Sequence, residues 1–333
     1  MSRKISFSAA TLEAMREEML RDASVFLMGE DIAKQGGIFG QFKGLAKSFP
    51  ERVRDFPISE AVLISSAIGA ALTGGRPVVD IHFSDFLTCA MDELINQAAK
   101  LHYMFGGQAS VPLVIRAPEG AVNSAGPQHS QCLESWFVGT PGWRVVSPSN
   151  PADAKGLLKT AIRSNDPVLY LEHKGLYTLR GEVSDSADAD GSDCLVPLGI
   201  GNVVREGADA TVVSWSRMVS VCTEAADALE ALGVSVELID LRTLSPWDRN
   251  LVFASLRKTG RLVVVHEAAR TCGVGAEILA SVSELDPSSL RAPAKRVANP
   301  DIPIAFSPAL EPVALPSADQ VIEAVKTVVE YPR

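Results

Sequence analysis

The chain has 333 residues and a formal net charge of −9; 47 % of its residues are hydrophobic and 21 % are charged. This is the balance of an ordinary globular protein, and the length suggests two domains. A negative chain without a basic stripe argues against a nucleic-acid partner. We find no apolar run of membrane-spanning length and no secretory signal after Met1, so we expect a cytoplasmic protein with no membrane partner.

The cysteines are scattered along the chain and form no CxxC pair. They are Cys89, Cys132, Cys194, Cys222 and Cys272. An odd number without paired spacing favours reduced thiols and argues against a zinc site. We expect all five to be small buried side chains.

The first 180 residues alternate between helical and extended patterns. We expect helices at 8–20, 60–72, 86–104 and from Asn150 onward, and strands at 25–28, 77–81, 111–116, 144–147 and 168–172. Asn150 suits a helix N-cap because Pro151 and Asp153 follow in the first turn. The helix from Glu60 to Leu72 is apolar nearly all round, which predicts that it is buried. Strands that alternate with helices predict a parallel sheet covered on both faces.

The composition changes at residues 181–194, which are small and acidic and predict an exposed linker. The alternation then restarts, with strands expected at 210–214, 234–239 and 261–266 and helices at 218–231, 246–257 and 274–284. Ser317 and Gln320 have the spacing of a capping box and predict a last helix. We therefore predict two α/β domains, residues 1–180 and 197–333, joined by a linker at 181–196.

Generic catalytic motifs are missing. Gly199-Ile200-Gly201 lacks the third glycine of a dinucleotide fingerprint, and the chain contains no GxSxG, HExxH or P-loop. NAD binding is therefore not expected.

Three places nevertheless attract attention. Glu60 opens an otherwise apolar helix; such carboxylates are most often partners of the helix dipole, and a ligand-facing role is the alternative. Gln128-His129-Ser130-Gln131 follows a turn-rich loop at the end of a predicted strand, where α/β proteins place chemistry, although a lone histidine is more often structural. His82-Phe83-Ser84-Asp85-Phe86 ends another strand, and its aromatic residues alone would indicate core.

Together these segments resemble one family. Phe56-Pro57-Ile58-Ser59-Glu60 resembles its "TPISE" motif, and Gln128-His129-Ser130-Gln131 resembles its "QHSQ" motif. Further matches occur in order along the chain, at residues 96–100, 103–107, 111–116, 153–157, 240–246 and 259–262. The resemblance is to the beta subunits of thiamin-diphosphate-dependent 2-oxo acid dehydrogenases of the pyruvate, branched-chain and acetoin types, which are relatives of transketolase.

The resemblance implies a fold and a reaction. The fold would be two doubly wound α/β domains, a thiamin-diphosphate pyrimidine-binding domain followed by a transketolase C-terminal domain. The reaction would be cleavage or oxidative decarboxylation of a small 2-oxo acid or acetoin, with acyl transfer to a lipoyl group on a partner acyltransferase.

The resemblance also implies residue roles. Glu60 would share a proton with the aminopyrimidine of thiamin diphosphate, Phe86 would stack on that ring, and Ile58 and His82 would lie at the cofactor. His129 would act on the substrate oxygen and assist acyl transfer to lipoamide. The family often has Met or Gln at position 82, so the imidazole there either alters substrate preference or is inert.

Half of a thiamin site is missing. Mg²⁺ and the diphosphate are held in this family by a Gly-Asp-Gly segment, which this chain lacks; its nearest string, Ala189-Asp190-Gly191, lies in the predicted linker. The resemblance implies that an alpha subunit holds them, in an assembly of two alpha and two beta chains. It also implies a K⁺ site formed by backbone carbonyls at Leu113, Ala161, Ser164 and Asp166, where Ser164 departs from the Asp often present.

Two rival functions remain. A stand-alone transketolase-like enzyme would need the missing Gly-Asp-Gly segment. A non-catalytic scaffold that pairs with an alpha chain would not need Glu60, Phe86 and His129 together. The sequence does not decide among pyruvate, branched-chain oxo acids and acetoin as the substrate.

Overall fold

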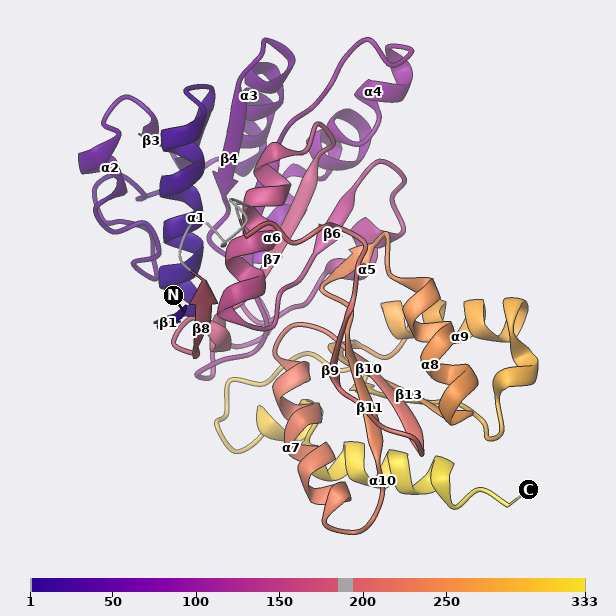
Figure 1. The fold of residues 1–333 in the computed structure, drawn as a ribbon. Helices are drawn as coiled ribbons and strands as arrows, with labels where there is room; N and C mark the ends of the chain where they lie inside the picture. The colour runs from indigo at the N-terminus through magenta and orange to yellow at the C-terminus, as the bar shows by residue number, and fades with distance from the viewer. Residues whose placement is uncertain (1, 185–193, 333) are drawn as a thin grey trace. The chain divides into compact units, whose positions relative to one another are not determined.

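The computed structural model describes residues 2–184 and 194–332, and the chain divides into two compact units (Figure 1). The first unit contains the chain up to residue 119 and residues 136–198, whereas the second contains residues 120–135 and the chain from residue 199 onward. Residues 120–135, predicted within the first domain, therefore associate with the second unit.

The predicted linker is only partly an irregular segment. Its first residues belong to strand β8 (Arg180–Ser184), which pairs antiparallel with β1 (Ser2–Ser6) at the start of the chain. Residues 185–193, including Ala189-Asp190-Gly191, lie outside the described residues.

The first unit is built on a parallel sheet, as the sequence predicts. Its strands are β2 (Val25–Gly29), β3 (Val53–Asp55), β4 (Arg76–Asp80), β5 (Val114–Glu119), β6 (Arg144–Val146) and β7 (Val168–His173). Within this unit they run in the order β6-β7-β5-β4-β2-β3, with every pairing parallel. All residues of β5 and β7 are buried, as expected for strands covered on both faces.

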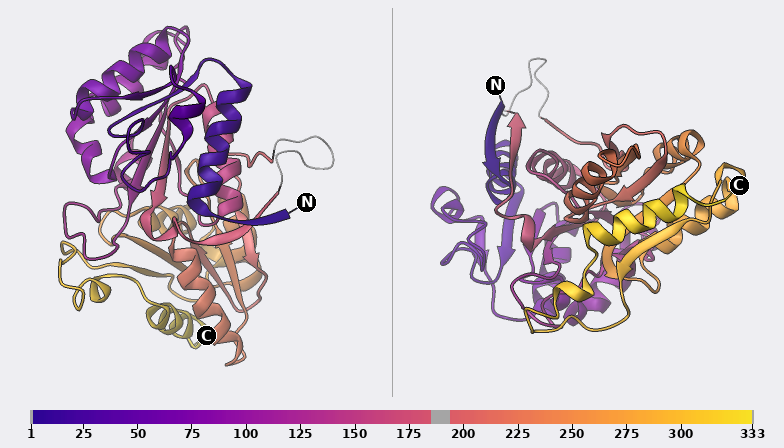
Figure 2. Two further views of the ribbon diagram at one scale, coloured as in Figure 1. Left: turned by 90° about the vertical axis from the view of Figure 1, so that its left-hand side faces the viewer. Right: turned by 90° about the horizontal axis from the view of Figure 1, so that it is seen from below.

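Helices α1 (Phe7–Arg21) and α6 (Pro151–Arg163) lie side by side on one face of this sheet (Figures 1 and 2). Lys155 and Lys159 of α6 are buried, and their amines lie 2.7 and 2.8 Å from the carboxylate oxygens of Glu17 in α1. The predicted N-cap of α6 is confirmed, because Asn150 Oδ1 accepts a hydrogen bond from the Asp153 amide.

The predicted helix at 86–104 is wrong in detail. The segment consists of a 3₁₀ helix η1 (Ser84–Ala90), a π-helical segment η2 (Glu93–Ala98) and one turn of α-helix, α4 (Leu101–Met104). The indole N–H of Trp143 donates to the Leu94 carbonyl at 3.1 Å, which occupies an acceptor in the π-helical segment. An inserted side chain of this kind distorts a helical hydrogen-bond ladder.

The apolar helix α3 (Glu60–Leu72) is buried on one side only. Leu63, Ile64 and Ala67 face the core of the unit, whereas Val62 and Leu72 are 55 % and 42 % exposed. The expectation of a helix buried all round is therefore wrong for the single chain.

The second unit contains a mixed sheet. Its strands are β9 (Asn202–Arg205), β10 (Ala210–Ser214), β11 (Val236–Asp240), β13 (Leu262–Ala269) and β14 (Lys295–Asn299), in the order β14-β13-β10-β11-β9. The pairings are parallel except that β9 runs antiparallel to β11. Four longer helices accompany them: α7 (Met218–Glu230), α8 (Arg249–Thr259), α9 (Val274–Leu285) and α10 (Ala318–Val329).

Side-chain alternation places these helices on two faces. Val212 of β10 packs with the buried residues of α7 and α10. Its neighbour Thr211 points the other way and bonds Ser255 and Thr259 of α8 at 2.6 and 2.7 Å. The sheet is therefore covered on both sides, and the predicted doubly wound class is confirmed in both units. The capping box at Ser317 and Gln320 is also present.

Several short elements were not predicted. They are α2 (Leu45–Ser48), α5 (Glu134–Val138), β12 (Thr243–Ser245), η3 (Lys174–Leu176), η4 (Pro287–Ser289) and η5 (Pro312–Ala314). The expectation for the cysteines is also partly wrong, because Cys222 is buried but Cys89 and Cys272 are exposed. No helix among the described residues has the length and apolarity needed to cross a lipid bilayer.

Candidate active site

The carboxyl ends of β2, β3 and β4 bring three ionisable side chains together in the first unit. Glu30 follows β2 directly, Glu60 opens α3 after β3, and His82 lies two residues beyond β4. Because parallel strands end at the same edge of a sheet, side chains distant in sequence meet there. The sequence singled out Glu60 and His82 but not Glu30.

Glu30 is the centre of this group. Its side chain is buried, and its Oε1 atom has no hydrogen-bond partner among the described residues. Burial raises the pKa of Glu30, and the negative charges of Glu60 and Asp31 raise it further, while His82 and the Ser59 amide oppose the shift. A signal for Glu30 existed in the sequence, since it is a carboxylate at the end of the apolar strand Val25–Gly29.

Both ring nitrogens of His82 face Glu30, and one of them is within hydrogen-bond distance. Nε2 lies 2.9 Å from the Glu30 carbonyl oxygen, and Nδ1 lies 3.6 Å from its carboxylate. Because a neutral imidazole donates through only one nitrogen, the carbonyl contact favours the tautomer with its proton on Nε2. The ring is 14 % exposed and is thus fixed at the edge of the site.

Phe86 belongs to an aromatic cluster beside this group. Its ring meets that of Phe83 at 5.6 Å in an edge-to-face arrangement, and Phe83 meets Phe39 at 5.8 Å in the same way. Lys174 Nζ lies 4.8 Å above the Phe83 ring. Ile58, by contrast, is 82 % exposed, so its apolar side chain has little cover within this chain.

A buried polar layer lies next to His82 along β4. Asp80 is fully buried, and burial raises its pKa to about 6 although the Arg116 charge opposes the shift. Gln41 Nε2 donates to Asp80 at 3.4 Å, and Gln41 Oε1 accepts from the Phe39 amide at 3.0 Å. This amide connects the sheet to the glycine-rich loop that carries Phe39.

Gly37 shows why that loop is glycine-rich. Its φ of +84° is in the left-handed region, and a Cβ there would lie 2.7 Å from the Gln41 side chain. A larger residue would therefore displace the amide that bonds Asp80.

His129 belongs to the second unit. It lies on residues 120–130, here called the histidine loop, and its amide donates to the Gly126 carbonyl at 3.3 Å. The side chain is partly buried. Glu60, His82 and Phe86 are thus grouped within one unit, and His129 is carried by the other.

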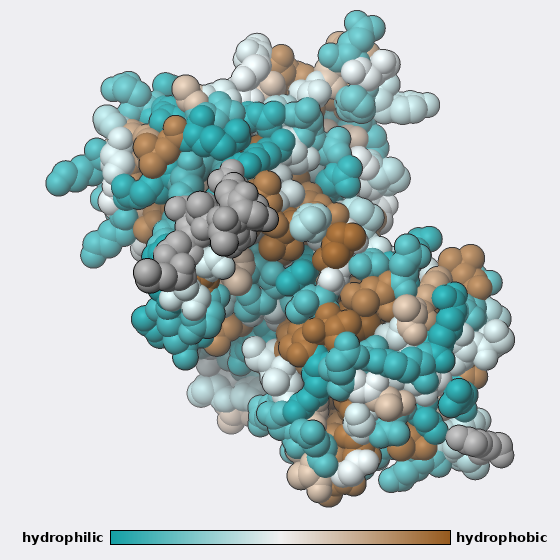
Figure 3. Space-filling model, in the orientation of Figure 1, coloured by the Kyte–Doolittle hydropathy of each residue, from teal (hydrophilic) through white to brown (hydrophobic). Residues whose placement is uncertain are grey.

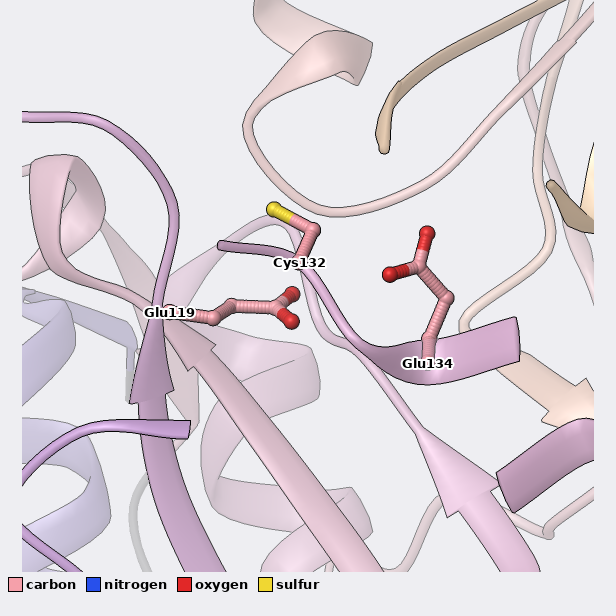
Figure 4. A group of neighbouring side chains, drawn as sticks. All are labelled: Glu119, Cys132 and Glu134. Carbon is pink, nitrogen blue, oxygen red and sulfur yellow. The ribbon is translucent and has the colours of Figure 1, made fainter. Parts of the chain in front are cut away.

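Two buried carboxylates, Glu134 and Glu267, lie close to each other, and Glu267 also bonds the start of the histidine loop. Glu267 of β13 accepts a hydrogen bond from the Ala121 amide at 2.7 Å. Glu134 is fully buried; burial and then the Glu267 charge raise its pKa to about 7, while the Trp215 side chain and its own backbone amide oppose the shift. Figure 4 shows Cys132 and Glu134 on the segment that follows this loop, and Glu119 at the end of β5.

Three of the four carbonyls predicted for K⁺, those of Leu113, Ala161 and Ser164, already accept hydrogen bonds. Leu113 O accepts from the Val168 amide at 2.8 Å, and Ala161 O from the Ser164 amide at 3.1 Å. Ser164 O accepts from Arg76 Nη1 at 2.9 Å, so the guanidinium of Arg76 already provides a positive charge at one of these carbonyls. The Asp166 carboxylate pairs with Arg144 at 2.7 Å. Each carbonyl retains a second lone pair for an ion.

The strand-end group fits the polar ring of a thiamin cofactor. A buried carboxylate oxygen without a partner, a second carboxylate at a helix start and a nearby aromatic cluster offer hydrogen bonding and a π face. Glu60 and Phe86 would contact the ring, and the cofactor would supply a carbon nucleophile for the carbonyl of the substrate.

Comparison with known proteins agrees with this chemistry. Residues 3–180 match the transketolase pyrimidine binding domain, and residues 199–321 match the transketolase C-terminal domain. The chain is 44 % identical to the acetoin:2,6-dichlorophenolindophenol oxidoreductase subunit beta of Cupriavidus necator, covering 98 % of both chains. It is 43 % identical to the pyruvate dehydrogenase E1 component subunit beta-2 of Oryza sativa, covering 98 % of this chain and 86 % of the relative.

Two more similarities extend this result. The chain is 40 % identical to the 2-oxoisovalerate dehydrogenase subunit beta of Bacillus subtilis, covering 98 % of this chain and 99 % of the relative. Its fold matches a solved structure described as a split gene transketolase, inactive beta4 tetramer, with a TM-score of 0.80, 24 % identity and 99 % coverage of both chains.

The two domains thus define a thiamin-dependent chain of the transketolase type. The protein belongs to the family of beta subunits of thiamin-diphosphate-dependent pyruvate, 2-oxoisovalerate and acetoin dehydrogenases. Beta subunits of this family work with an alpha subunit in dehydrogenase complexes.

We predict that Glu134→Gln changes the pH dependence of stability. Because the pKa of Glu134 rises from 4.5 to about 7 on folding, the contribution of this carboxyl group to wild-type stability falls as pH increases through that interval and is then constant. The side-chain amide of Glu134→Gln does not ionise, so the variant does not lose this stability as the pH rises. Relative to wild type, the variant should gain up to about 3 kcal/mol between about pH 5 and about pH 8. Thermal unfolding at the two pH values measures the effect.

Glu323→Gln is the matched control, because Glu323 is exposed on α10. It should follow wild type at both pH values. If Glu134→Gln also follows wild type, the carboxyl does not hold its proton in the folded protein.

Proposed function

We propose that this chain supplies the pyrimidine half of a shared thiamin-diphosphate active site, with Glu60 as the proton-sharing carboxylate. The grouping of Glu60, Glu30 and His82 at the strand ends supports this most directly. The pKa of Glu30 is raised, and its carboxylate accepts a hydrogen bond from the backbone of Ser59, the residue that precedes α3. A carboxyl group whose pKa is raised holds its proton more firmly than an exposed one, which suits a neighbour of a group that must exchange a proton.

Ile58 and Phe86 are proposed to contact the aminopyrimidine. The exposed side chain of Ile58 is free to meet a ligand, and Phe86 presents a ring at the edge of the aromatic cluster. His82 is proposed to hold Glu30 rather than to bind substrate, because both of its nitrogens already face Glu30. The unusual imidazole at this position would then affect proton exchange more than substrate choice.

The diphosphate and Mg²⁺ are proposed to be held by an alpha chain, in an assembly of two alpha and two beta chains. The sequence contains no Gly-Asp-Gly segment. Large apolar side chains that a single chain would normally cover are exposed on and near α3 and α4: Ile58, Val62, Tyr103, Met104 and Phe105. Figure 3 likewise shows apolar areas among polar ones on the face it draws. Exposed apolar side chains gathered in one region of a chain are typical of interaction surfaces.

His129 is proposed to act on the substrate and to assist acyl transfer to the lipoyl group of a partner acyltransferase. An imidazole suits both steps, because it exchanges a proton near neutral pH. The substrate is a small 2-oxo acid or acetoin, since the relatives act in pyruvate, 2-oxoisovalerate and acetoin systems.

A K⁺ ion is proposed at the carbonyls of Leu113, Ala161, Ser164 and Asp166. Exchange of K⁺ for tetramethylammonium at equal ionic strength should lower the melting temperature by a few degrees, since a bound ion at about 100 times its dissociation constant contributes about 2.7 kcal/mol. Differential scanning calorimetry measures this. An unchanged melting temperature would leave Arg76 as the cation that satisfies this turn.

We predict that Glu60→Gln lowers turnover of the assembled enzyme by roughly two to four orders of magnitude. Glutamine keeps the shape and one hydrogen bond but does not share a proton in the same way. Assembly with the alpha chain, measured by size-exclusion chromatography, should be unchanged. Glu51→Gln, at an exposed turn of the same unit, is the control. Activity of Glu60→Gln within a few-fold of wild type would refute the role.

We also predict that the purified beta chain alone binds thiamin diphosphate weakly and is inactive. It lacks the Gly-Asp-Gly segment that would hold the metal. Isothermal titration calorimetry with Mg²⁺ should show tight binding only after a cognate alpha chain is added. Binding in the micromolar range or tighter by the lone chain would contradict the half-site.

A further inference from the structure

The histidine loop is covered by one segment of the same unit. This segment, residues 300–316, connects β14 to α10 and is here called the strap. Three positions of the loop contact it. Ala121 is buried in an apolar cluster with Ile304 and Ala314 of the strap.

The second contact is polar. The Ser124 amide donates to Glu311 Oε2 of the strap at 2.8 Å. The third is steric: a Cβ on Gly126 would lie 2.3 Å from the Phe306 ring, so the ring lies directly over the loop backbone. Gly126 is also the residue whose carbonyl accepts the His129 amide. The strap therefore reaches to within three residues of the histidine.

The loop adopts a conformation that requires such support. Asn123 and Ser124 both have φ of +56°, in the left-handed region that residues with a Cβ rarely occupy. Two consecutive strained residues persist only where neighbouring groups hold them. Glu311 bonds the amide of the second strained residue, so it acts at the point where the loop would otherwise relax.

Two side chains outside the strap bond the start of the loop. Glu267 accepts from the Ala121 amide at 2.7 Å, and Arg217 Nη1 donates to the Ala121 carbonyl at 3.3 Å. Between Ala121 and His129, the Glu311 carboxylate is the side chain shown bonding the strained turn. Losing it would leave the start of the loop anchored while the strained turn lost its polar contact.

We propose that Glu311 is a positioning residue for His129. Its carboxylate fixes the strained turn at Asn123 and Ser124 and thereby sets where the imidazole stands during acyl transfer. This inference rests on the proposed function of His129. It adds Glu311, a second residue of this unit, to the support of the reaction, although the unit supplies none of the residues grouped around Glu60.

The test uses the assembled alpha–beta complex and five variants: Glu311→Ala, Glu311→Gln, His129→Ala, the double variant Glu311→Ala/His129→Ala, and Glu323→Ala. Glutamine keeps an oxygen that accepts from the Ser124 amide, whereas alanine removes it. Glu323→Ala removes the same charge from an exposed position on α10. Each variant is assayed with an artificial electron acceptor and in the lipoyl-dependent reaction.

Glu311→Ala should lower kcat of the lipoyl-dependent reaction on the order of tenfold to a hundredfold, as misplacement of a catalytic group does, with KM for the substrate changed only a few-fold. Glu311→Gln should retain most of the activity, and Glu323→Ala should equal wild type. The double variant should be no slower than His129→Ala, because residues that act through one group are not additive.

Three outcomes would overturn the proposal. In the first, Glu311→Ala equals wild type while His129→Ala is impaired, which leaves the proposed function intact. In the second, the two losses multiply in the double variant. In the third, Glu311→Gln is as impaired as Glu311→Ala, including the case in which neither assembles. Full activity of His129→Ala in both assays would instead refute the role of His129 and the inference with it.

Discussion

The ion pair between Arg116 and Glu172 is the interaction on which the first domain depends. Arg116 Nε and Nη2 donate to the two carboxylate oxygens at 2.6 and 3.0 Å, and both side chains are only 1 % exposed. The pair joins the central strands β5 and β7. Arg116 also reaches Thr11 of α1 at 3.2 Å and lies 4.6 Å above the Phe42 ring. Removing one partner of such a pair leaves a buried charge and costs about 3–5 kcal/mol.

This pair also shapes the edge of the sheet where the site lies. Its positive member lowers the pKa of buried Asp80, against the larger effect of burial, and Asp80 holds Gln41 of the glycine-rich loop. Charged and polar side chains buried in this core need hydrogen-bond or ionic partners, because an unpaired group is costly at low dielectric. His82, which bonds the Glu30 carbonyl, lies two residues beyond Asp80 on the same strand end.

Periodicity predicted most of the long elements, because strands and helices of an α/β fold are set by local patterns. The ribbon of β1 and β8 was missed because it pairs residues about 180 positions apart, as at Ser2 and Ser184. Within the irregular segment at 86–104 the Leu94 carbonyl accepts the indole N–H of Trp143, a contact with a distant residue that local periodicity does not indicate. Glu30 was overlooked although it obeys the same strand-end rule as His82. The site was predicted mainly by resemblance, and no local pattern indicates that Glu311 supports the histidine loop.

In the part that the structure describes, the single chain leaves some polar groups without partners and some apolar side chains exposed to water. Glu30 keeps a buried oxygen without a partner among the described residues, and α3 exposes apolar side chains on one side. A protein that functions alone would normally pair the first and cover the second, since both lower its stability or solubility. The proposed assembly would complete both features, with a polar cofactor ring at the carboxylate and an alpha subunit on the exposed side of α3. The energetically costly features of the isolated chain therefore support that proposal.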